Sequence, residues 1–270
     1  MSPLRRGAPW LLLAVLVLAQ IGYPLTAGAD RARLTVLTVV LGYLLSVGHA
    51  LLTRGVRVAA ALVVVTTGGG LAVEALGLAT GFPFGGYDYS GQLGPKLLGV
   101  PLVIPLAWTW MAWPAWLAGV RLARRRAVRV VLAGVGLAAW DLFLDPQMVG
   151  EGYWTWVDPV PALPGVPSVP VGNYLGWLVV ALAMMTVLAA ATGRSPTASP
   201  GPAGGTADDR PMYALYLWTY ASSILAHAVF LDLPASAVWG GLAMAVVAVP
   251  LAVALIRAPR RAPGLTRRRP

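Results

Sequence analysis

Two long apolar runs flank a block of arginines in PLVIPLAWTWMAWPAWLAGVRLARRRAVRVVLAGVGLAAWDLFLD, residues 101–145. The runs extend over residues 101–120 and 128–145. A helix needs roughly 20 apolar residues to cross the hydrocarbon core of a bilayer, which is about 30 Å thick. The arginines between the runs belong in water or among lipid head groups. The pattern therefore predicts two transmembrane helices joined by a short basic loop.

Apolar runs of similar length occur along the whole chain. The eight predicted spans are Trp10 to Ala29, Leu34 to Thr53, Val58 to Thr80, Pro101 to Val120, Val128 to Asp145, Asn173 to Thr192, Met212 to Leu231 and Ala235 to Ile256. Only 11% of the residues are charged and 58% are hydrophobic, whereas an average soluble domain has about 25% charged residues. We predict an all-α, polytopic integral membrane bundle of about eight helices.

The basic residues assign a topology to these spans. Cytoplasmic loops are enriched in Lys and Arg, and 17 of the 20 basic residues fall on one predicted side. This predicts a multi-pass protein of the cell membrane with cytoplasmic N- and C-termini. The net charge of +10 then indicates contact with anionic lipids, not with nucleic acid. Because cysteine is absent, disulfides, thiolate metal sites and cysteine nucleophiles are excluded.

We predict a single transmembrane domain over residues 1–270. Within it, residues 193–211 read as a flexible cytoplasmic linker and residues 257–270 as a basic disordered tail. The first span has an alternative interpretation as a cleaved signal peptide, because arginines precede it and Ala27, Gly28 and Ala29 end it.

Two loops on the predicted external side mix glycine and proline with aromatic and acidic residues. They extend from Gly81 to Val100 and from Pro146 to Gly172. Segments this apolar do not float freely in water, and irregular backbone at membrane depth is tolerated only where protein or a cavity satisfies its polar groups. We therefore predict that both loops are ordered and folded back over the bundle.

Three acidic residues stand out as candidate catalytic groups. Glu74 and Asp141 lie inside predicted spans, where ionisable groups are costly and mark function by default. Asp145 lies four residues after Asp141, so the two carboxyl groups share a helix face, although Pro146 is expected to end the helix there. Two such carboxyl groups in a poorly hydrated site favour one shared proton and form an acid and base couple. The structural alternative is burial against a partner such as Asn173.

Two motif clusters resemble the bisanhydrobacterioruberin hydratase family of membrane carotenoid biosynthesis proteins. The first is GFPFGGYDY at residues 81–89, with Gly99-Val100-Pro101 and residues 104–108 after it. The second is DLFLDP at residues 141–146, with GYWTW at 152–156 and NYLGW at 173–177. The segment of residues 157–172 departs from the family pattern, because it is longer and richer in proline than the family leads us to expect. This difference leaves the identity of the substrate open.

The resemblance implies an enzyme that adds water to the terminal double bond of an acyclic carotenoid end group, without cofactor or metal. Asp141 or Glu74 would be the acid and Asp145 its partner. The expected substrate-binding residues are Phe82, Phe84, Tyr87, Asp88, Tyr89, Trp108, Tyr153, Trp154, Trp156, Asn173 and Trp177. The expected partners are a carotenoid, membrane lipids and, as candidates, other enzymes of the carotenoid pathway.

Two alternatives remain open from the sequence. Asp141 and Asp145 imitate half of the aspartate motifs of a membrane prenyltransferase, although Asp208 and Asp209 fall on the opposite predicted side. A magnesium requirement would favour that enzyme class. The third interpretation is a carotenoid-binding subunit without catalysis, which would return its pigment unchanged.

Overall fold

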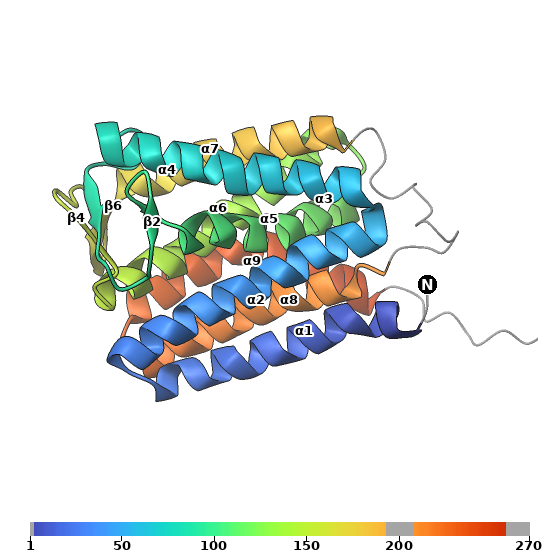
Figure 1. The fold of residues 1–270 in the computed structure, drawn as a ribbon, viewed down its shortest axis with the longest axis horizontal. Coiled ribbons are helices and arrows are strands. Elements are labelled where there is room, and N and C mark those ends of the chain that lie inside the picture. Colours follow the sequence, from blue (N-terminus) through green and yellow to red (C-terminus); the bar gives the residue numbers. More distant parts are fainter. Residues whose placement is uncertain (1–2, 193–207, 258–270) are drawn as a thin grey trace, which may run out of the picture.

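The computed structural model describes residues 3–192 and 208–257, which form a helical bundle with short strands in two of its connections (Figure 1). The helices are α1 (Pro3–Gly22), α2 (Gly28–Arg54), α3 (Val56–Leu62), α4 (Gly69–Thr80), α5 (Val103–Leu122), α6 (Arg126–Gly150), α7 (Val171–Ala191), α8 (Arg210–Leu225) and α9 (Pro234–Ile256). The shorter turns are η1 (Tyr23–Leu25), η2 (Val63–Gly68) and η3 (Ala226–Phe230). Because η2 is a π-helical segment that joins α3 to α4, these three form one rod.

Seven helical segments in the described part of the chain are long and apolar enough to cross a membrane. They coincide with seven of the eight predicted spans, and this confirms the all-α polytopic bundle. The eighth prediction, Met212 to Leu231, corresponds to α8 with its π-helical extension η3. That segment is helical and packs against α5 and α9, but it is not among the seven apolar segments.

The two predicted external loops lie together at one end of the bundle, on the left in Figure 1. They carry β1 (Tyr87–Tyr89), β2 (Lys96–Leu97), β3 (Val100–Pro101), β4 (Trp154–Trp156), β5 (Ala162–Leu163) and β6 (Val166–Pro170). Strands β1 and β4 pair antiparallel and join the two loops. The prediction of ordered loops that cover the bundle is therefore correct. Residues 193–207 of the predicted linker and 258–270 of the predicted tail lie outside the described residues.

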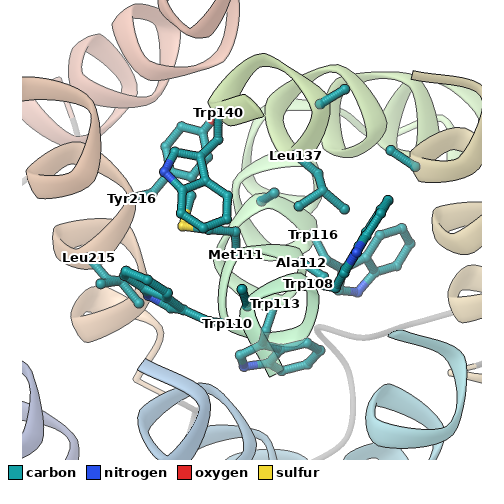
Figure 2. Close-up of a cluster of buried hydrophobic side chains, with 14 of the residues drawn as sticks. Trp108, Trp110, Met111, Ala112, Trp113, Trp116, Leu137, Trp140, Leu215 and Tyr216 are labelled. Atoms are coloured by element: carbon teal, nitrogen blue, oxygen red, sulfur yellow. The ribbon is translucent and has the colours of Figure 1, made fainter. Parts of the chain in front are cut away.

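Helix α5 is the centre of the bundle, and its side chains are buried on every face. It contacts α2, α4, α6, α8 and α9. Figure 2 shows Trp108 and Trp116 pointing to one side of this helix and Trp110 to the other. Because protein and not lipid surrounds α5, its aromatic residues pack in the core, as expected for a helix that is apolar all round.

Close packing of α2 on α5 depends on a glycine. A Cβ atom on Gly42 would lie 2.5 Å from the Trp110 ring, which is closer than real Cβ contacts. The Ser46 hydroxyl also donates to the Trp110 carbonyl oxygen at 2.8 Å. The two backbones can approach this closely only because position 42 has no side chain.

We therefore expect Gly42→Ala to lower the free energy of unfolding by about 3 kcal/mol, because overfilling a packed core forces backbone or rotamer shifts. Gly48→Ala is the matched control, since Gly48 lies on the same helix and a Cβ atom there meets nothing within 4 Å. The measurement is the thermal midpoint of each detergent-solubilised variant. Equal midpoints for the two variants would contradict the packing argument.

The end of α6 differs from the sequence prediction. We expected Pro146 to end the helix at Asp145, but α6 continues to Gly150. Proline cannot donate to the carbonyl oxygen of Leu142, and the Ser236 hydroxyl of α9 donates to that oxygen instead, at 2.7 Å. A donor from another helix thus replaces the lost hydrogen bond. Asp141 and Asp145 consequently lie on one continuous helix.

Candidate functional site

The β1–β4 ladder turns four aromatic side chains toward the bundle. Tyr87 pairs with Trp156 and Tyr89 with Trp154, with ring centroids 5.8 Å and 5.5 Å apart. Alternate residues of a strand point to opposite faces, so the residues between them, including Asp88, point away. Two short segments that are far apart in sequence thereby form one aromatic wall.

A carboxyl pair from α6 faces this wall. Asp141 and Asp145 are each 2% exposed and lie one turn apart on the same helix. The Asn173 amide of α7 donates to Asp141 Oδ2 at 3.3 Å and also to Asp145 Oδ2. Trp154 Nε1 donates to Asp145 Oδ1 at 3.2 Å. Asp145 therefore accepts a hydrogen bond at each of its oxygens.

Asp141 differs from Asp145 in having one oxygen without a donor. Its Oδ1 atom is buried and has no hydrogen-bond partner among the described residues. A buried oxygen without a donor costs less on a neutral carboxyl group than on an ionised one. The hydrogen bonds therefore favour the proton on Asp141, whereas Asp145, which accepts at both oxygens, has the partners of a carboxylate.

Glu74 of α4 faces the pair with a different set of partners. Its Oε2 atom accepts from the hydroxyls of Tyr87 and Tyr89 at 2.5 Å and 2.8 Å, and its Oε1 atom accepts from Trp108 Nε1 at 3.3 Å. Burial raises the pKa of both phenols, and the Glu74 charge raises it further, so both remain protonated donors. Three donors on one carboxyl group are the partners that an ionised carboxylate takes.

One cavity of about 30 Å³ joins the three acidic residues. We call it the acidic cavity. Its wall consists of Glu74, Phe84, Tyr87, Tyr89, Ile104, Ala107, Trp108, Leu137, Trp140, Asp141, Leu144, Asp145, Trp154, Trp156, Asn173 and Trp177. Trp108 and Trp177 stack with their ring centroids 3.5 Å apart. This described wall contains no Lys, Arg or His, so no basic side chain neutralises the acids.

Eleven of the fourteen residues proposed for the site from sequence line the acidic cavity. The other three lie elsewhere. Phe82 is 69% exposed, Asp88 is exposed on the outer face of β1, and Tyr153 is buried outside the cavity wall.

The aliphatic part of the wall and Trp140 were not predicted from the sequence. Leu137 and Leu144 lie four residues before and three residues after Asp141, so they share its helix face. Ile104 likewise lies four residues before Trp108, whereas Ala107 and Trp140 directly precede Trp108 and Asp141. Helical spacing around Asp141 and Trp108 was therefore a signal for Leu137, Leu144 and Ile104 only.

The arrangement combines a carboxyl group able to give a proton, an adjacent carboxylate able to take one, and aromatic faces able to stabilise a cation. These are the requirements of acid-catalysed addition to an alkene. The aromatic and aliphatic remainder of the wall suits an apolar substrate.

Two comparisons with known proteins relate the chain to carotenoid biosynthesis. The model of a family described as "Carotenoid biosynthesis protein" matches residues 34–255. Bisanhydrobacterioruberin hydratase from Haloarcula japonica is 35% identical over 111 residues, which are 39% of this chain. The chain spans only 36% of the length of that relative. No solved structure matches.

Proposed function

The chain belongs to the carotenoid biosynthesis protein family, and from this premise we propose that it is a carotenoid hydratase. Its reaction would add water to the terminal double bond of an acyclic carotenoid end group and give a tertiary alcohol. We further propose that it resides in the cell membrane with both termini cytoplasmic, because the basic residues favour that topology. The acidic cavity would then lie near the external face.

The observation that carries the proposal is the difference between the two aspartates. They share one helix face and one amide donor, but only Asp141 has a buried oxygen without a partner. This supports Asp141 as the acid, in preference to Glu74, whose carboxyl group already accepts three hydrogen bonds. Asp145 would be the base.

In the first step, the proton of Asp141 would move to the less substituted carbon of the double bond. The π electrons form the new C–H bond, Asp141 becomes a carboxylate, and the neighbouring carbon becomes a tertiary cation. Trp108 and Trp177 line the same cavity, and their rings would stabilise the positive charge. The Glu74 carboxylate, which belongs to the same wall, would add a favourable field.

In the second step, the oxygen of a water molecule would attack the cation while Asp145 accepts a proton from that water. The product is the tertiary alcohol. Transfer of the proton from Asp145 to Asp141, which share the Asn173 amide as a donor, would restore the starting state. In the net reaction, one alkene and one water molecule are consumed and one alcohol is formed.

The acidic cavity of about 30 Å³ is too small for an isoprenoid end group, so substrate entry requires side chains to move. Tyr89, Trp156 and Trp177 are the half-buried aromatic members of the wall. The Tyr89 hydroxyl is held by Glu74, so the rings of Trp156 and Trp177 are the candidates to swing outward.

Expression in a host that makes a linear carotenoid tests the proposal. We expect pigment whose mass has increased by one water per reacted end, and no such product from the host alone. Addition of a metal chelator to membranes is expected to leave the activity intact. Unchanged pigment that copurifies with the protein would instead identify a carotenoid-binding subunit, and a magnesium requirement would favour a prenyltransferase.

A further inference from the structure

A second cavity lies next to the acidic cavity, between α1, α2, α5, α6 and α8. Its volume is about 130 Å³, which is room for several water molecules. The polar side chains of its wall include Gln20, Tyr23, Thr35, Thr38, Gln147, Thr219, Ser222 and Ser223. We call it the hydroxyl-lined cavity. The catalytic scheme above does not use it.

Three residues of this wall carry buried polar atoms without a partner. The Tyr23 hydroxyl, Thr219 Oγ1 and Trp110 Nε1 have no hydrogen-bond partner in the described part of the chain. All three residues line the hydroxyl-lined cavity and are buried. An unsatisfied buried polar group costs free energy, and ordered water is the usual partner where protein supplies none.

The two cavities share part of their walls. Ile104, Ala107, Trp140, Leu144 and Trp154 line both. Trp154 also donates to Asp145, the proposed base. A water molecule leaving the hydroxyl-lined cavity past these side chains would therefore arrive beside the group that must take its proton.

We propose that the hydroxyl-lined cavity is a water-binding site that supplies the hydration reaction, an inference that rests on the proposed function. The polyene occupies the aromatic side of the acidic cavity, formed by Phe84, Tyr87, Trp108, Trp156 and Trp177. Water enters from the opposite side, where hydroxyl groups line the protein. This separation keeps the cation dry until the attacking water reaches it.

Isotope exchange distinguishes water supply from acid catalysis. In D2O, Asp141 carries a deuteron and delivers it to the alkene. If no water captures the cation, loss of a proton from a neighbouring carbon returns an alkene that contains deuterium. A variant with impaired water supply therefore makes less alcohol but still labels the recovered substrate, whereas a variant without the acid does neither.

The test compares membranes that contain wild type, Thr219→Val or Ser223→Ala, supplied with an acyclic carotenoid in D2O. We expect each variant to hydrate about tenfold more slowly, the effect of one lost hydrogen bond to the reacting water. Deuterium in the recovered alkene is expected to equal or exceed that of the wild type. Two variants are used so that a folding defect in one does not decide the result.

Thr186→Val is the matched control, because Thr186 is exposed on α7 and its hydroxyl bonds only the Leu182 carbonyl oxygen of its own helix. Its hydration rate should equal that of the wild type. Unchanged hydration in both cavity variants would overturn the water site. So would a parallel loss of hydration, labelling and carotenoid retention, which would assign the cavity to the polyene. If the wild type gives no hydrated product, the proposed function itself fails, and the water site with it.

Discussion

Asp141→Asn is expected to lower carotenoid hydration by about a thousandfold or more, the scale of a general acid's contribution. The amide is nearly isosteric with the carboxyl group but has no acidic proton to give to carbon. Asn173 donates to Asp141 Oδ2, and the carbonyl oxygen of the new amide can accept the same bond. The fold and the retention of pigment should therefore persist. Hydrated product and deuterium labelling of the alkene, measured by mass spectrometry, are expected to disappear together.

Glu74→Gln separates the two candidate acids. The Gln side chain offers one acceptor oxygen to three donors, so the arrangement of Tyr87, Tyr89 and Trp108 is disturbed and the charge is lost. We expect a loss of roughly tenfold, the scale of one charge-assisted hydrogen bond, with deuterium labelling retained. The opposite ranking, with Glu74→Gln inactive and Asp141→Asn active, would move the acid to Glu74.

The transmembrane spans were predictable from sequence because a bilayer of fixed thickness imposes a length on every crossing helix. The seven apolar helices begin and end within six residues of their predicted bounds. Helix α5 was predicted as a span like the others, although it is the buried centre. Hydropathy alone does not reveal this, because a helix surrounded by protein and one surrounded by lipid are both apolar.

The aromatic wall was predictable only in part. The composition of GFPFGGYDY and GYWTW indicated a site, but the pairing of β1 with β4 is a contact between segments more than 60 residues apart. That pairing decides which residues face inward, and it turns Asp88 away from the acidic cavity. The continuation of α6 past Pro146 was equally hidden, since the replacement donor, Ser236, belongs to another helix.

The carboxylate partner gives the second large effect. Asp145→Asn is expected to reduce hydration by about a thousandfold, because the attacking water then has no base to take its proton. Asp141 remains in place, so protonation of the alkene continues. The Asp141 carboxylate that results can then take a proton back from the cation. We therefore expect deuterium in the recovered alkene of Asp145→Asn, in contrast to Asp141→Asn.

The same substitution also tests whether the two aspartates act as a pair. Asp145 accepts from Trp154 at one oxygen and from Asn173 at the other, and an amide can satisfy only one of these donors. The thermal midpoint of Asp145→Asn is therefore expected to fall, whereas pigment retention should show that the cavity persists. If Asp145→Asn loses labelling together with hydration while it still retains pigment, the proton comes from Asp145, and the roles of the two residues must be exchanged.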